Sequence, residues 1–132
     1  MHIHEIVHKD ILIPISRQFP TIKEMMVVSV AGYSVAGWDT EGRGPTIDYN
    51  PLEIMATVNR SILERIMEII DGGIPRYSIF AGQDATHLVY RIGHENEFLL
   101  SVYIAGNPPF DPIINYIADR DHLSKIERFF DS

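Results

Sequence analysis

The stretch Asn50–Gly73, NPLEIMATVNRSILERIMEIIDGG, predicts one long helix around which the rest of the chain can be arranged. Asn50 can cap its start, Pro51 suits the first helical position, and Glu53 lies where a capping box needs it. The Asp-Gly-Gly sequence at 71–73 marks its end, because glycine readily takes the left-handed backbone that terminates a helix.

The apolar side chains of this helix cover a broad arc. One stripe consists of Met55, Val58, Ile62, Ile66 and Ile69, and it is widened by Leu52, Leu63, Met67 and Ile70. This arc is wider than a single contact with a sheet requires. Burying about ten such side chains contributes on the order of 15 to 30 kcal/mol before entropy is subtracted. We therefore expect a second surface, a further copy of the chain, to cover part of the helix.

Composition bounds the protein to a single soluble domain over residues 1–132. A hydrophobic fraction of 45% with 22% charged residues is ordinary for a packed globular domain. The 18 Asp and Glu against 11 Lys and Arg give a net charge of -7, which disfavours nucleic acid and anionic membranes as partners. Without cysteine there are no disulfides and no zinc sites of cysteine type. No signal peptide or membrane-length apolar run is found, so a cytoplasmic protein is expected.

The remaining pattern predicts helices at both ends and strands between them. A short N-terminal helix is expected over 10–19, with Pro14 in its first turn, and residues 1–9 are expected to fray. Strands are expected over 25–30, 33–40, 76–81, 86–92 and 98–105. A flexible loop is expected over 39–49, and the last helix begins at Asp111.

These elements predict an α/β protein, more narrowly an α+β sandwich of order α-β-β-α-β-β-β-α. Its five-stranded antiparallel sheet has the long helix on one face and the terminal helices on the other. Strands 25–30 and 98–105 are almost continuously apolar and should be central. Strand 76–81 begins after Pro75 and carries few charges, so it is an unguarded edge that invites pairing. Because this edge directly follows the broad apolar helix, we expect a two-fold dimer there.

The chain resembles the roadblock dynein-light-chain family, a profilin-like sandwich, over roughly residues 10 to 130. The resemblance is carried by Phe19–Lys23 leading into 26–30, a hairpin at Gly32 followed by Tyr33–Ala36, the helix 51–70 with a small residue at Ala56, and the strand 98–104. Ala31 departs from the polar residue that the family usually has before the hairpin glycine.

The resemblance implies homodimers or heterodimers that form through the long helix and the third strand. It also implies binding of Ras-like small GTPases, or a scaffold role in motors and lysosomal complexes, with no shared catalytic residue and no cofactor. The implied interface consists of Met55, Asn59, Ile62, Ile66, Arg76, Tyr77, Ser78, Ile79 and Phe80.

Several residues allow two interpretations. Trp38 is a candidate partner contact, but a lone tryptophan more often fills the core beneath a helix. Arg43 is a faint candidate for an arginine finger, the cation that assists GTP hydrolysis. His2, His4 and His8 could bind a metal, although a solvated N-terminus is the simpler expectation.

A further motif and two histidines are expected to have structural rather than catalytic roles. The sequence GYSVA at 32–36 nearly matches the nucleophile elbow of hydrolases, but its strand-forming continuation favours a hairpin turn. His87 is expected on a strand surface and His94 in a turn.

Three functions follow as hypotheses, none of which uses a catalytic residue or a cofactor. The leading one is a dimeric module that binds a Ras-like GTPase and regulates or anchors it. The second is a structural adaptor independent of any GTPase. The third is a small-molecule sensor, which would need a buried pocket with convergent polar groups.

Overall fold

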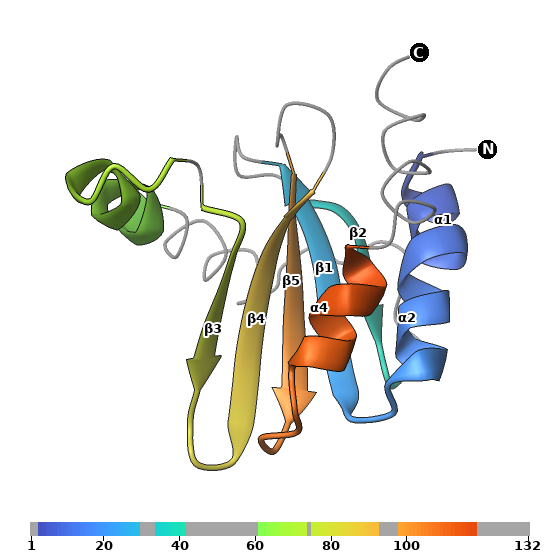
Figure 1. Cartoon of the computed structure of the whole chain (residues 1–132). Coiled ribbons are helices and arrows are strands. Elements are labelled where there is room, and N and C mark those ends of the chain that lie inside the picture. Colours follow the sequence, from blue (N-terminus) through green and yellow to red (C-terminus); the bar gives the residue numbers. More distant parts are fainter. Residues whose placement is uncertain (1–2, 30–33, 42–60, 74, 93–97, 119–132) are drawn as a thin grey trace.

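A five-stranded antiparallel sheet forms the centre of the protein (Figure 1). The computed structural model describes residues 3–29, 34–41, 61–73, 75–92 and 98–118. The strands are β1 (Ile22–Ser29), β2 (Ser34–Asp39), β3 (Tyr77–Ala81), β4 (Ala85–Ile92) and β5 (Phe98–Ala105). Their spatial order is β2-β1-β5-β4-β3. The predicted α+β class is therefore confirmed, with the apolar strands β1 and β5 inside the sheet and β3 at an edge.

Helical segments lie on both faces of the sheet. The N-terminal segment runs through α1 (Ile3–Val7), the π-helical turn η1 (His8–Leu12) and α2 (Ile13–Gln18), and α4 (Asp111–Ile117) follows the last strand. Both pack on the face shown towards the viewer in Figure 1. A further helix, 61–69, lies beside β3 and packs towards the opposite face. None of the helices in the described ranges is long and apolar enough to cross a lipid bilayer.

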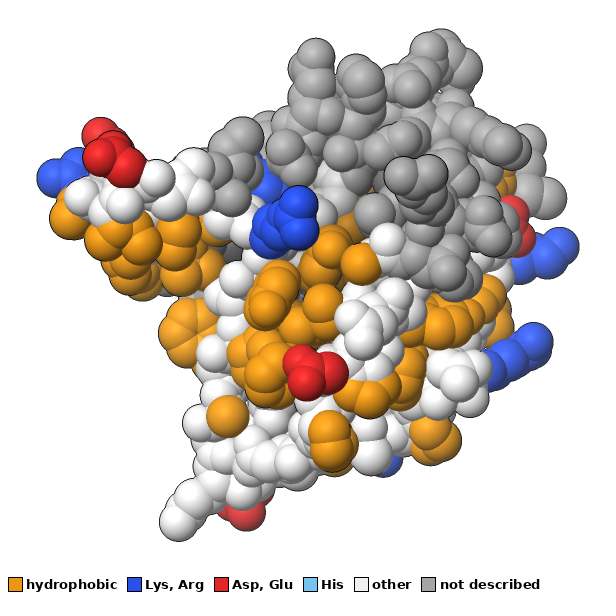
Figure 2. All heavy atoms as spheres, in the orientation of Figure 1, with side chains coloured by type: hydrophobic (Ala, Val, Ile, Leu, Met, Phe, Trp, Pro, Cys, Tyr) orange, Lys and Arg blue, Asp and Glu red, His pale blue; other side chains and the backbone are white. Residues whose placement is uncertain are grey.

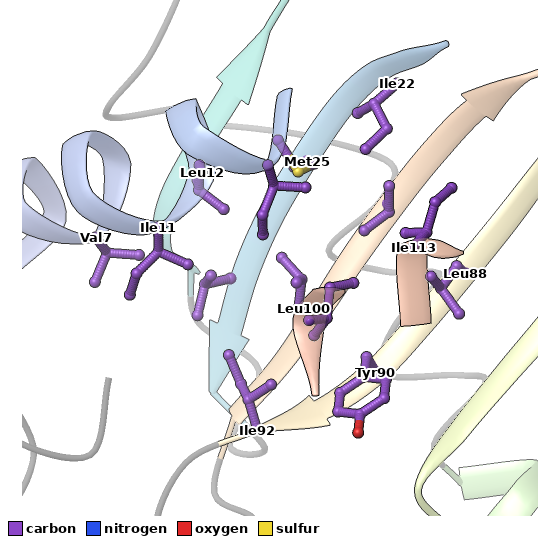
Figure 3. Close-up of a cluster of buried hydrophobic side chains, with 14 of the residues drawn as sticks. Val7, Ile11, Leu12, Ile22, Met25, Leu88, Tyr90, Ile92, Leu100 and Ile113 are labelled. Carbon is purple, nitrogen blue, oxygen red and sulfur yellow. The ribbon is translucent and has the colours of Figure 1, made fainter. Parts of the chain in front are cut away.

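One apolar core joins the N-terminal helical segment and α4 to the sheet (Figure 3). Alternate residues of each strand point into it, because side chains of a strand alternate between the two faces. The labelled members are Val7, Ile11, Leu12, Ile22, Met25, Leu88, Tyr90, Ile92, Leu100 and Ile113. The predicted alternation in β4, with Leu88, Tyr90 and Ile92 on one face, is confirmed.

Residues 3–9, within the stretch for which the sequence predicts fraying, are helical. Val7 is fully buried in the core and anchors this segment to the sheet. Pro14 would normally break such a helix, because it lacks an N–H and its ring clashes with the carbonyl four residues back. The π-helical turn that precedes Pro14 opens the backbone there, and the Ile13 N–H bonds to the His8 carbonyl instead. A single helical segment thus continues past the proline.

Two predicted boundaries shift by a few residues. The first strand starts at Ile22 rather than at residue 25. Asp39 does not begin a loop: it is the buried last residue of β2, and its carboxylate accepts a hydrogen bond of 3.0 Å from the Glu41 N–H. The predicted end of the N-terminal helix before Pro20 is confirmed, since α2 ends at Gln18.

The predicted end of the long helix is also confirmed. The Gly72 N–H bonds to the Met67 carbonyl at 2.8 Å, a bond that closes a helix C-terminus. Asp71 and Gly73 both have positive φ, of 52° and 79°. At Gly72 a Cβ atom would lie 2.6 Å from the Met67 sulfur, so the absent side chain lets the chain turn closely over the helix towards β3.

Some predictions lie outside the described residues. They concern the hairpin at Gly32, the loop residue Arg43, the start of the long helix up to Arg60 with Met55 and Asn59, His2, His94, and the chain beyond Ala118.

Candidate interaction surface

Helix 61–69 has two apolar faces with different surroundings. Leu63 lies on the side towards the sheet, where it lines a small cavity with Val89 and Leu99 on the face opposite the main core. The other apolar face is exposed, and we call it the isoleucine stripe: it consists of Ile62, Ile66, Ile69 and Ile70. Ile69 is 74% exposed and Ile66 44%. One side of the helix therefore faces the sheet, and the isoleucine stripe lies on a different side.

An ion pair joins this helix to the sheet. Arg91 of β4 lies 3.0 Å from the Glu64 carboxylate, atom to atom between Nη1 and Oε1. The arginine side chain is 12% exposed and the glutamate 39%, so the pair lies at the border of the helix–sheet contact. The pair marks the side of the helix that faces the sheet, since Glu64 lies on that side and the isoleucine stripe lies on another.

Beside the stripe, β3 offers its backbone to a partner strand. The Arg91 N–H bonds to the Arg76 carbonyl at 2.8 Å, so these two residues form a hydrogen-bonded pair of the β3–β4 ladder. In an antiparallel ladder such pairs alternate, so even-numbered residues bond to β4. The odd-numbered residues Tyr77, Ile79 and Ala81 therefore direct their N–H and C=O groups away from the sheet.

The side chains of β3 have different environments on its two faces. Tyr77 is 45% exposed and stacks on Tyr90, with ring centroids 6.0 Å apart and planes within 2°. Phe80 is 48% exposed on the other face. Ser78 is buried, and Ile79 packs against the core of its own subunit. Of the predicted interface residues on β3, the structure thus presents Tyr77 and Phe80 outward.

Together the isoleucine stripe and the β3 edge form one surface, which Figure 2 shows as hydrophobic side chains along the lower side of the helix, above a hollow beside β3. Ile62, Ile66 and Arg76, all predicted to lie at an interface, are exposed here. Exposed apolar patches of this kind mark contact sites on soluble proteins. The structure brings the helix and strand parts of the predicted interface together.

Two cavities near this surface are lined by described residues, and they are too small or too open to enclose a metabolite. The cavity lined by Leu63, Ser78 and Arg91 measures about 20 Å³, enough for one water molecule. The buried Ser78 hydroxyl has no hydrogen-bond partner among the described residues. A larger hollow of about 390 Å³ is an open groove between the helix end and Pro75, with Glu64, Glu68 and Asp71 on its rim.

The remaining candidate residues lie away from this surface. Trp38 packs partly buried against the core, as its simpler interpretation expects, and its contact with a partner stays a prediction. The prediction of a solvated N-terminus is wrong for His8: its Nδ1–H donates a hydrogen bond of 2.8 Å to the Gly37 carbonyl of β2. In the described ranges, no group of three or more His, Asp or Glu side chains could hold a metal ion.

His87 is not a surface residue, contrary to the sequence-based expectation. It is buried on the face of β4 opposite the main core, and its Nε2 lies 2.7 Å from the Ser101 hydroxyl. Burial lowers the pKa of His87 below its ordinary value of 6.5. Ser101 is fully buried, so this hydroxyl–imidazole pair is shielded from any substrate in solution. The alternating pattern of β4 correctly predicted that His87 and Leu88 point to different faces of the sheet. It could not show that the face with His87 is buried too.

The fold and this surface define an α+β sandwich with one edge strand and one apolar helix face open to a partner. Neither a protein-family profile nor a curated protein sequence matches the chain. Solved structures do: the gliding protein MglB from Thermus thermophilus aligns with a TM-score of 0.68 at 14% identity, covering 91% of this chain and 87% of that one. A Roadblock/LC7 domain from Streptomyces avermitilis gives 0.69 at 14% identity, with 90% and 93% covered.

An MglB structure with a tetrameric arrangement also aligns, with a TM-score of 0.67 at 14% identity over 91% of this chain and 87% of that one. At such identities the likeness concerns the fold. The chain has the Roadblock/LC7 fold, as the resemblance in its sequence predicted.

Proposed function

We propose that the chain is a non-catalytic dimeric module that binds a Ras-like small GTPase in the cytoplasm and regulates or anchors it. The observation that carries this proposal is the isoleucine stripe beside the open edge of β3. The Roadblock/LC7 fold supports it, since the resemblance implies GTPase-binding dimers. The similarity in fold to an MglB structure with a tetrameric arrangement supports a module that assembles with other protein chains.

The dimer forms through the long helix and β3, with a second copy as the partner. An exposed stripe of four isoleucines is unfavourable in water, whereas burying each of them contributes about 1.5 to 3 kcal/mol. An edge strand alone would satisfy its outward backbone groups with water. The two features lie side by side, so one partner surface can cover both.

The GTPase binds to this dimer by protein contacts, without a chemical step by the module. If binding accelerates GTP hydrolysis, the module acts by ordering the switch loops of the GTPase, since a fixed surface can favour one loop conformation over others. If it does not, the dimer anchors the GTPase at a defined place.

Titration calorimetry tests the proposal directly. The wild-type protein is titrated with Ras-like GTPases encoded in the same genome, each loaded with GDP or with a non-hydrolysable GTP analogue. We expect binding in one nucleotide state and weaker binding in the other. Absence of binding in both states contradicts the proposal and favours the structural adaptor, whereas equal binding in both states favours anchoring of the GTPase over regulation.

The two cavities lined by described residues give little support to a small-molecule sensor, because one holds a single water molecule and the other is an open groove. A thermal-shift screen with metabolites checks this alternative. A clear rise in melting temperature with one compound would favour the sensor.

A further inference from the structure

We infer that two copies pair their β3 strands in one particular register, in which Ile79 of each copy lies on the two-fold axis and Tyr77 faces Ala81 of the other copy. This inference rests on the proposed dimer and specifies its geometry. It follows from the backbone of β3, from the residues that flank this strand and from its exposed aromatic side chains.

The ladder with β4 restricts which residues can pair. Only the odd-numbered residues of β3 direct N–H and C=O groups outward, so an antiparallel partner strand must place its own odd-numbered residues opposite them. A two-fold axis then passes through residue 78, 79 or 80. The pairing of even with odd residues would leave outward groups facing inward ones and is excluded.

The residues that flank β3 on either side favour one of these three axis positions. An axis at residue 78 places Ala81 opposite Pro75 of the partner, which has no N–H to donate. An axis at residue 80 places Tyr77 opposite Gln83 of the partner, which lies beyond the strand in the turn to β4. An axis at residue 79 pairs Tyr77 with Ala81 and Ile79 with its own copy, so all outward groups of β3 find partners.

The side chains favour the same register. Tyr77 and Phe80 are the exposed large side chains of β3, one on each face. With the axis at residue 79, Tyr77 lies opposite Ala81 and Phe80 lies opposite Ser78. Each exposed aromatic ring thus faces a small residue of the other copy, which leaves room for it on that face.

Phe80 of one copy also meets the hollow part of the other. Ser78 lines the small cavity beneath Leu63, and this cavity lies on the face to which Phe80 points. The ring of Phe80 from the second copy therefore covers the cavity mouth, next to the helix that carries the isoleucine stripe. Strand pairing and helix packing become parts of one interface.

Cysteine cross-linking tests the register, and the chain suits it because it contains no cysteine. Tyr77→Cys and Ala81→Cys are made separately, and both positions are exposed in the single subunit. In the inferred register each variant alone places its two thiols about 14 Å apart, beyond disulfide reach, whereas residues 77 and 81 of two copies face each other at about 5 Å. Refolding the two variants together should give a disulfide-linked dimer on mild oxidation, and neither variant alone should give one.

Ser78→Cys and Phe80→Cys are the matched controls for the other registers. Rapid cross-linking of either variant alone would place the axis at that residue and overturn the inference while leaving the dimer intact. A dimer by light scattering that gives no link in the mixture of 77 and 81 variants would also overturn it. A wild-type protein that stays monomeric at every concentration would instead contradict the proposed dimer itself, and the register with it.

Discussion

The two edge strands of the sheet, β2 and β3, differ in how far the rest of the chain covers them. At the β2 edge, the N-terminal helical segment contacts the strand, and His8 donates its Nδ1–H to the Gly37 carbonyl. The Thr40 N–H bonds to the Lys23 carbonyl, so the even-numbered residues of β2 bond to β1. The odd-numbered residues, Gly37 among them, therefore direct their backbone groups away from β1. At the β3 edge, Tyr77 and Phe80 are exposed, and within the described part of the chain no backbone hydrogen bond to the outward groups of β3 is found.

This difference indicates that the β3 edge is the one that can pair with another chain. Natural sheets protect an edge with covering segments, charges or short strands, because an open edge pairs with other chains. The β2 edge has such a cover within its own subunit. The β3 edge instead has the isoleucine stripe next to it, which increases its tendency to associate. With one edge covered and the other open, the subunit can pair through a single edge, which favours the proposed dimer over open-ended polymerisation.

The largest expected effect is the loss of the dimer on Ile66→Asp. Burying a fully exposed isoleucine contributes about 1.5 to 3 kcal/mol, and Ile66, at 44% exposed, has roughly half of this left to gain. The two-fold axis doubles that half to about 1.5 to 3 kcal/mol, and two aspartates buried without partners add to the loss, so the dissociation constant should rise at least about 10- to 10²-fold. Because Ile66 is exposed in the subunit, circular dichroism should show an intact fold. Size-exclusion chromatography with light scattering measures the change.

Gln18→Asp is the matched control for this variant. It adds the same charge at an exposed position of α2, away from the open edge, and should leave the dimer unchanged. An Ile66→Asp protein that dimerises as tightly as the wild type would show that the helix stripe is not the interface.

The next effect separates the two sides of β3. Ile79 packs against the core of its own subunit, so Ile79→Asp should destabilise the fold by about 2 to 5 kcal/mol rather than give a folded monomer. Urea unfolding in the Ile66→Asp background measures this without a contribution from dimerisation. The control Ile79→Val should cost about 0.5 to 1.5 kcal/mol. Full stability of Ile79→Asp would mean that this side chain faces the partner instead.

The position of β3 at an edge of the sheet, and the end of the helix before it, could be predicted from the sequence. The apolar run Phe98–Ala105 was long enough to fix β5 at both ends, and Pro75 marked the edge strand because proline cannot donate to an inner ladder. The Asp-Gly-Gly sequence at 71–73 marked the helix end for a similar local reason. Such signals depend on residues close in sequence, which is why they were readable.

The covered edge could not be predicted in the same way. Val7, Ile11 and Ile15 recur every four residues, a helical spacing, yet a regular helix tolerates Pro14 only in its first turn, so the sequence predicts a helix that begins no earlier than residue 10. Only the π-helical turn before Pro14 reconciles the two, and its formation depends on packing against the sheet. The direction of the isoleucine stripe likewise depends on the placement of Leu63 over the cavity that it lines together with Val89, which is distant in sequence.

A smaller effect is expected at the covered edge itself. His8→Ala removes the donor to the Gly37 carbonyl and should lower the free energy of unfolding by about 1 kcal/mol. His8→Asn, whose amide nitrogen can take the place of Nδ1, should restore part of this loss. Urea unfolding measures both variants, again in the Ile66→Asp background. Equal stability of His8→Ala and the parent would show that the edge is closed by helix packing alone.

The last expected effect is a change of slope with pH, at the buried histidine next to the open edge. His87 lies between Phe80 and Tyr103 in the cross-strand register, and its pKa is lowered by burial. The unfolded chain therefore binds more protons than the folded one as the pH falls below 6.5, so the free energy of unfolding decreases there and is greatest above that pH. His87→Gln keeps a hydrogen-bonding group towards Ser101 but cannot titrate. Unfolding measured from about pH 8 to about pH 5.5 should thus depend less on pH in this variant than in its parent. An unchanged slope would mean that the buried imidazole near Phe80 contributes nothing to acid sensitivity, and that other groups cause it.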